Sequence, residues 1–123
     1  MANLNNSLAT AMQITGAIGV AIVDIDSGMT LAQAGGGEQL NLDVAAAGNT
    51  EVMRAKMRTM ADLDLQDEIE DVLITLGKQY HIIRPIRTKG GAGLFMYIAL
   101  DKGQSNLAMA RHKLADIEKT LTL

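Results

Sequence analysis

Two stretches of the chain are apolar at nearly every position, and they constrain the fold more than any other feature. Residues Ala17 to Ile25 and Ala92 to Asp101 each have the length of a β-strand and carry apolar side chains on both alternating sets. Successive side chains of a strand point to opposite faces of a sheet, so each of these strands needs an apolar layer on both sides. We therefore expect a sheet with helices on its two faces, which is a three-layer arrangement.

Three segments have the helical spacing that such layers require. Apolar residues recur with the period of a helix in residues 3 to 14, in residues 41 to 61 and again after Ser105. Asn41 and Ser105 stand at the starts of the last two segments and are candidate N-caps. We expect the long middle helix to cover one face of the sheet and the two terminal helices to cover the other.

The long helix has one broad apolar face. Its members are Ala45, Ala46, Val52, Met53, Met57, Met60 and Leu63. Arg54 and Arg58 fall on the opposite face and are expected to point away from the sheet. Lys56 falls inside the apolar arc, which is a local conflict in the pattern.

Short turns separate the remaining strands. Met29 to Ala34 follows a turn at residues 26–28, Val72 to Leu76 leads into a tight turn at Gly77-Lys78, and Tyr80 to Thr88 returns from it. Strands joined by so few residues are antiparallel. Pro85 lies late in its strand and predicts a bulge or a fraying end.

A further turn is expected at Lys89-Gly90-Gly91. The predicted fold is a single α/β domain over residues 1–123, an α-β-α sandwich around a mainly antiparallel sheet, with the element order helix, two strands, helix, three strands, helix.

The composition excludes several classes of function. The 123 residues carry a net charge of −3 and include two Tyr, one Phe and no Trp, so they lack the basic field and the stacking surface that nucleic acids require. The chain has no cysteine, which excludes thiol catalysis and fits a reducing compartment. No apolar stretch reaches the ~20 residues of a membrane-spanning helix. We expect a cytoplasmic protein that neither binds nucleic acid nor inserts into a membrane.

The residues that could carry chemistry do not form any known pattern. His81 and His112 are not at metal-binding spacing, and Gly35-Gly36-Gly37 is followed by Glu38 instead of the Lys and Ser or Thr of a phosphate-binding loop. An acidic run comprises Asp62, Asp64, Asp67, Glu68, Glu70 and Asp71. It lacks the glycine of a calcium-binding loop and suits a solvated loop or a partner-facing patch. We expect no catalytic residue, no cofactor and no metal.

Two pairs of segments, together with the element order, resemble a known family. They are Asp71 to Leu76 with Gln79 to Pro85, and Gly93 to Asp101 with Ser105 to Arg111. The chain resembles the prokaryotic form of the Roadblock / dynein light chain 7 family over nearly its whole length. The resemblance implies a profilin-like α-β-β-α-β-β-β-α domain with strand order 2-1-5-4-3, and no enzymatic activity.

The resemblance also implies a function. Members of the family dimerise through the third strand and the long helix, and they are partners or regulators of small Ras-like GTPases. The homodimer interface expected here comprises Ala45, Ala46, Val72, Leu73, Ile74 and Thr75. The expected GTPase contacts on the long helix are Arg54, Lys56, Met57 and Arg58. The alternative is a sensor domain of the same architecture that binds a small molecule between its sheet and a helix.

Overall fold

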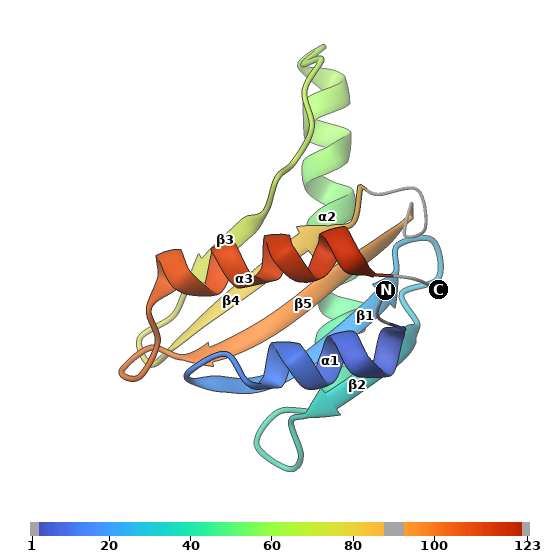
Figure 1. Cartoon of the computed structure of the whole chain (residues 1–123). Helices are drawn as coiled ribbons and strands as arrows, with labels where there is room; N and C mark the ends of the chain where they lie inside the picture. Colours follow the sequence, from blue (N-terminus) through green and yellow to red (C-terminus); the bar gives the residue numbers. More distant parts are fainter. Residues whose placement is uncertain (1–2, 88–92, 122–123) are drawn as a thin grey trace.

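The computed structural model, which describes residues 3–87 and 93–121, has the three layers expected from the sequence (Figure 1). The elements in chain order are α1 (Leu4–Met12), β1 (Ala17–Asp24), β2 (Thr30–Gly35), α2 (Leu42–Asp62), β3 (Val72–Thr75), β4 (Gln79–Pro85), β5 (Leu94–Asp101) and α3 (Leu107–Thr120). This order is the predicted one. The turn expected at Lys89-Gly90-Gly91 lies outside the described residues.

The five strands form one antiparallel sheet in the order β2-β1-β5-β4-β3. The two strands with apolar residues on both faces, β1 and β5, lie side by side, and β5 is the central strand of the sheet. In β5 every residue from Leu94 to Leu100 is buried, which is what cover on both sides produces. The sequence correctly predicted both the three layers and the strands at their centre.

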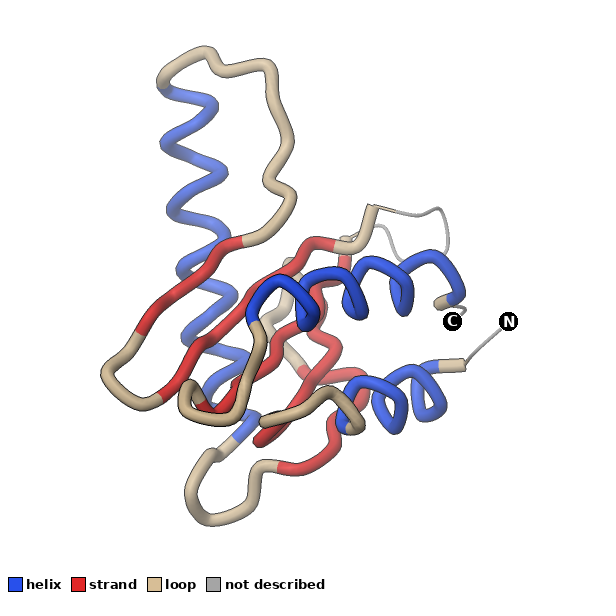
Figure 2. Tube along the Cα trace, turned by 60° about the vertical axis from the view of Figure 1, so that its left-hand side comes forward, coloured by secondary structure: helices blue, strands red, loops and turns tan. Residues whose placement is uncertain are grey.

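The two faces of the sheet are covered by different helices. α1 and α3 lie on one face and α2 lies on the other (Figure 2). Leu8 and Leu114 from the terminal helices pack against Ile22, Met96 and further strand residues of the first core. The second core, beneath α2, contains Ala46 and Met53 of the helix with the strand residues Val23, Phe95 and Tyr97. Each core therefore takes alternate residues of the same strands.

Local signals in the sequence explain where α2 begins and ends. The Asn41 side chain accepts hydrogen bonds from the backbone N–H groups of Asp43 (3.1 Å) and Val44 (3.2 Å), so Asn41 is the predicted N-cap. At the other end Asp64 adopts a left-handed conformation (φ 56°), and Leu65 N–H donates to the Met60 carbonyl at 2.9 Å. This is a Schellman-type ending, in which an aspartate takes the usual place of glycine.

The N-cap of α3 differs from the prediction by one residue. The Asn106 side chain accepts the N–H of Met109 at 3.0 Å, and Ser105 does not cap the helix. The Ser105 hydroxyl instead donates to the Asp101 carbonyl at 2.6 Å. The Ser105 side chain is therefore occupied by the turn after β5, and the Asn106 side chain accepts a hydrogen bond from one of the free N–H groups at the start of α3.

Pro85 is the last residue of β4, so of the two outcomes predicted there, a bulge or the end of the strand, the structure shows the end of the strand and no bulge. Pro85 pairs with Phe95 in regular register, and the next residue, Ile86, still donates its N–H to the Leu94 carbonyl at 2.9 Å. Hydrogen-bonded pairs alternate along an antiparallel ladder, so the Pro85 nitrogen faces away from β5. On the side of β4 that faces β3, the pairing with β3 begins only at Ile83. The missing N–H of Pro85 therefore removes no hydrogen bond of the sheet.

Candidate protein-interaction surfaces

The first half of α2 is seated on the sheet. Its buried residues are Leu42, Ala46, Thr50 and Met53, and the helix packs against β1 and β2. On the same face of the sheet, Val72 and Ile74 of β3 pack at the margin of the core and remain partly exposed. β3 is also the last strand of the sheet, so no strand among residues 3–87 and 93–121 pairs with its outer backbone edge.

The flank of α2 on the side of these strands is made of small residues. Ala45, Gly48 and Val52 follow one another at intervals of three and four, which places them on one side of a helix. A Cβ added to Gly48 would meet no atom within 4 Å, so space is open beside it. We call Ala45, Gly48 and Val52 with Val72 and Ile74 of β3 the α2–β3 surface.

One pocket, of about 390 Å³, lies beside the second half of α2. A second pocket, of about 340 Å³, lies between the first half of α2 and strands β4 and β5. His81 and Tyr97 line this second pocket, together with Asn49 of α2. The His81 Nδ1 atom lies 3.2 Å from the Tyr97 hydroxyl and its Nε2 atom 2.8 Å from the Gln79 side-chain oxygen. A small-molecule sensor would hold its ligand in this place.

Burial controls the protonation of both rings in this pocket. It lowers the pKa of His81 below its ordinary value and raises the pKa of Tyr97 to about 12. The uncharged histidine can then donate from Nε2 to Gln79 and accept the Tyr97 hydroxyl proton at Nδ1. This cluster could not be predicted from the sequence, because it depends on the register between the strands that carry His81 and Tyr97.

Of the six residues predicted for the dimer interface, the structure brings three together on the α2–β3 surface: Ala45, Val72 and Ile74. Ala46 is 0% exposed and packs against the sheet, and the side chain of Leu73 packs with the core beneath α1 and α3. Thr75 is exposed at the end of β3. A helix flank and a strand face each offer only alternate residues to a partner, which contiguous sequence cannot show.

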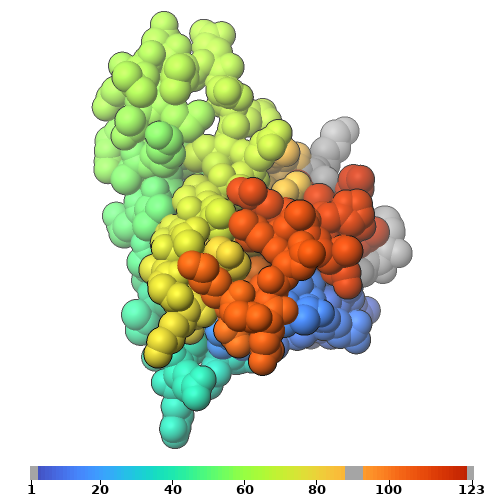
Figure 3. All heavy atoms as spheres, turned by 90° about the vertical axis from the view of Figure 1, so that its left-hand side faces the viewer, coloured from blue at the N-terminus to red at the C-terminus, as the bar shows by residue number. Residues whose placement is uncertain are grey.

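The second half of α2 does not rest on the sheet. None of its residues after Met53 is buried, and the helix projects beyond the end of the sheet with the segment that returns to β3 (Figure 1). The space-filling view shows the same projection as a separate lobe (Figure 3). We call residues 54–71 the arm. Its apolar residues include Met57, which is 48% exposed, and Leu63 and Leu65.

The pocket of about 390 Å³ lies where the arm meets the end of the sheet, and we call it the arm pocket. Its apolar lining includes Met53, Met57 and Met60 of α2, Leu65 and Ile69 of the returning segment, and Pro85 of β4. Asp67, Glu68 and Arg87 also line it. The sequence signal for this pocket is the broad apolar face of the long helix, which includes all three methionines.

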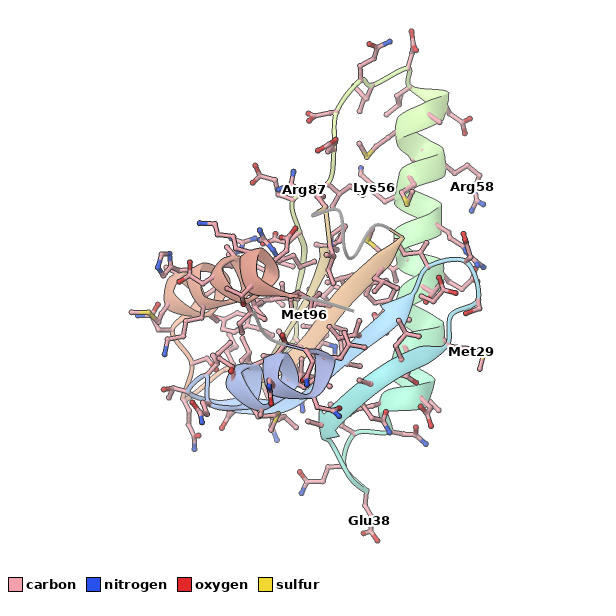
Figure 4. The ribbon with its side chains drawn as sticks, turned by 45° about the vertical axis from the view of Figure 1, so that its right-hand side comes forward. Met29, Glu38, Lys56, Arg58, Arg87 and Met96 are labelled. Atoms are coloured by element: carbon pink, nitrogen blue, oxygen red, sulfur yellow. The ribbon has the colours of Figure 1, made fainter. Side chains whose placement is uncertain are left out.

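The four predicted GTPase contacts do not form one patch. Arg58 and Lys56 are exposed and point to opposite sides of α2, and Met57 lines the arm pocket (Figure 4). Arg54 differs most from the prediction, since its guanidinium donates to the Ile25 carbonyl at 2.8 Å and to the Asp26 carbonyl. It therefore ties α2 to the β1–β2 turn, where a solvated position facing away from the sheet was expected.

The acidic run is partly used by the fold. Asp71 accepts two hydrogen bonds from the Arg111 guanidinium, at 2.7 and 2.9 Å, and so joins the start of β3 to α3. The Glu68 Oε2 atom lies 3.3 Å from the Arg87 Nη1 atom. Within residues 3–87 and 93–121, no group of three or more acidic, histidine or cysteine side chains could hold a metal ion.

These features define a class: a profilin-like α/β domain with a helix flank, a sheet edge and a projecting arm that are open at its surface. Among the described helices, none is long and apolar enough to cross a membrane.

The fold is that of the Roadblock/LC7 domains. The structure is similar to the Roadblock/LC7 domain from Streptomyces avermitilis, with a TM-score of 0.80 and 12% identity over 97% of this chain and 94% of that one. It is similar to Myxococcus xanthus MglB, with a TM-score of 0.76 and 16% identity over 94% and 91%. A third structure, MglB with a tetrameric arrangement, gives a TM-score of 0.75 and 15% identity over 92% and 80%. No family model matches the sequence, and a search of curated proteins finds no match.

Proposed function

We propose that the protein is a non-catalytic regulator of a small Ras-like GTPase, and that it acts as a homodimer which presents α2 to the GTPase. The observation that carries this proposal is the Roadblock/LC7 fold, combined with a helix flank and a sheet edge that are open beside each other. The sequence resemblance to that family supplies the GTPase as the class of partner.

The α2–β3 surface supports self-association. Ala45 and Gly48 allow a second helix to approach closely, and Val72 and Ile74 offer apolar area beside an unpaired strand edge. One protein of this fold is described as having a tetrameric arrangement, so the fold is compatible with assembly. A stable homodimer needs well over ~1,000 Å² of buried surface, and a helix flank together with a strand edge can supply an area of that order.

Charged and apolar groups on α2 support the GTPase contact. Arg58 is exposed on the outer side of the helix, where a dimer formed through the opposite flank leaves it accessible. Lys56 points to the flank of the α2–β3 surface and would lie near the second copy. We therefore assign Arg58 and Met57 the central part in GTPase binding, with Arg54 shared between fold and partner.

The first experiment tests the homodimer. Gly48→Arg places a long side chain on the open flank, and the monomer accommodates it because nothing lies within 4 Å of the position. We expect the wild-type protein to sediment as a dimer at micromolar concentration and the variant as a monomer. Ala47→Arg, the neighbouring exposed position on a different side of α2, is the control. A wild-type monomer at tens of micromolar would refute the homodimer.

The second experiment tests the GTPase. The purified protein is titrated into Ras-like GTPases of the same organism that carry a fluorescent GTP analogue. We expect saturable binding to one of them, and Arg58→Glu should weaken it by ~10-fold, because charges at an interface set association and orientation. Lys119→Glu makes the same charge change on the exposed side of α3 and should have no effect. Equal losses in the two variants would show that net charge, and not α2, determines binding.

A further inference from the structure

We infer that the arm pocket binds a basic amphipathic helix of a partner protein, with the apolar residues of that helix inserted among the methionines and its basic residues facing the acidic run. The pocket includes Met57, to which a GTPase contact is assigned above, but the inference does not require that the partner be a GTPase. Its support comes from the lining, the size and the charge of the pocket.

The lining suits apolar side chains of varied shape. Met53, Met57 and Met60 are spaced four and three residues apart, so all three face the same side of α2. Leu65 and Ile69 line the pocket from the returning segment. Methionine has a flexible, polarisable side chain that adapts to different partners, and it is frequent on surfaces that bind helices.

The pocket is large enough to hold more than one side chain. Its volume of about 390 Å³ falls within the ~300–1,000 Å³ of typical ligand clefts. The side chains of the second half of α2 leave the pocket open, because none of them is buried. Apolar area of this kind is costly to leave in water and favours an apolar occupant.

The charge around the pocket selects the kind of occupant. Residues 62–71 contain six acidic residues and no basic one, and two of the six, Asp67 and Glu68, line the pocket itself. Glu68 and Asp71 have arginine partners, whereas Asp62, Asp64, Asp67 and Glu70 make no ion pair within the described part of the chain. Arg87 lines the pocket, but it is the partner of Glu68.

An acidic rim attracts basic residues and repels anions. An anionic membrane surface and a nucleic acid are therefore both disfavoured at this site. A segment with apolar anchors on one face and Lys or Arg on the other fits the lining and the charge together, and a helix provides that separation of faces.

The pocket and the α2–β3 surface lie on different sides of α2 but meet at the returning segment. Met57 and Ala61 turn toward the side of α2 that also carries Arg54, which contacts the β1–β2 turn. Ala45 and Val52 turn toward β3 and β4. Met60, Leu65 and Ile69 line both the arm pocket and the hollow beside Val52 and Val72. Sedimentation tests the homodimer and peptide binding tests the pocket, so the two inferences can fail separately.

The probe is a synthetic peptide of leucine and lysine at helical spacing, measured by calorimetry against the full chain. We expect micromolar binding that weakens as salt is added. A peptide with glutamate in place of lysine keeps the apolar face, and a scrambled leucine–lysine peptide keeps the charge. Both should bind at least ~10-fold more weakly.

Matched variants locate the site. Met57→Gln and the double change Asp64→Asn with Asp67→Asn should each weaken binding ~10-fold; asparagine is also well accepted at the left-handed conformation of Asp64. The controls are Met29→Gln, at a methionine that is 68% exposed and does not line the pocket, and Glu38→Gln, at the opposite end of the molecule from the arm (Figure 4).

The result that supports the inference is a loss confined to the arm variants. Failure of the leucine–lysine peptide to bind would overturn it, as would equal binding of the scrambled peptide or equal losses in the Met29 and Glu38 controls. GTPase binding is not measured here, so failure of the proposed function would leave this result unchanged.

Discussion

The two halves of α2 have similar sequence patterns and different environments. In the first half, Ala46 and Met53 are buried against the sheet. In the second half, Met57 and Met60 continue the same apolar stripe, yet they meet a pocket and not the core. The difference arises because the helix of 21 residues is longer than the sheet beneath it (Figure 1). An apolar stripe therefore shows that a surface is made to be covered, without showing whether the same chain covers it.

The largest expected difference lies between two methionines four residues apart. Met53→Ala removes a side chain that is 1% exposed and packs with Phe95 and Tyr97, and it should lower the free energy of unfolding by ~2–5 kcal/mol. Met57→Ala removes a side chain that is 48% exposed and should cost less than ~1 kcal/mol. Urea unfolding of the two variants measures both values. Similar losses would mean that the arm is as firmly packed as the rest of the helix.

The next difference lies between two arginines. Arg54→Ala removes donors from the Ile25 and Asp26 carbonyls and loosens the link between α2 and the β1–β2 turn. Because the guanidinium is partly exposed and water can replace it, we expect a loss of ~1 kcal/mol. Arg58→Ala should change stability by less than ~0.5 kcal/mol.

Thermal melting compares the two arginine variants directly. Arg54→Lys is a further variant that keeps the charge but loses the planar donor geometry, so it should recover only part of the stability. A normal melting temperature for Arg54→Ala would show that the contacts to the turn carry no net energy.

The sequence predicted the fold almost completely, because the fold depends on patterns that are local. Two-sided apolarity placed Ala17 to Ile25 and the strand that ends at Asp101 inside the sheet, and Asn41 marked the start of α2. The strand order, which makes these two strands neighbours, was implied by the family resemblance. Even the small error at the N-cap of α3 concerns two adjacent polar residues that compete for the same role, Ser105 and Asn106.

The candidate sites were predicted less well, because they depend on distances between elements. Sequence spacing placed Arg54 opposite the sheet, but it could not show that the β1–β2 turn reaches that side of the helix. Nor could it show that the half of α2 that carries Lys56 and Arg58 would stand clear of the sheet (Figure 1). The cluster of His81 and Tyr97 depends on the register of β4 against β5.

That cluster leads to the smallest predicted effect, which concerns the seated half of α2. Burial lowers the pKa of His81 below its ordinary value of 6.5, so the folded state favours the neutral ring. The resulting stability is fully present above pH 6.5 and is lost as the pH falls below it through the folded-state pKa. Asp24, whose pKa is lowered from 3.8 chiefly by its hydrogen bond from Ser27, titrates in a more acidic range.

Tyr97 affects stability at alkaline pH. Burial raises its pKa to about 12, so the stability that its neutral hydroxyl contributes is lost only when the pH rises above 10.0. We therefore expect the free energy of unfolding to decline slightly from pH 7 toward about pH 5. His81→Gln should flatten that decline, because glutamine does not titrate. If the His81 variant followed the wild-type curve, the polar cluster beneath α2 would not influence stability in this range. If it departs from that curve, the seated half of the helix covers a cluster that makes the stability sensitive to pH.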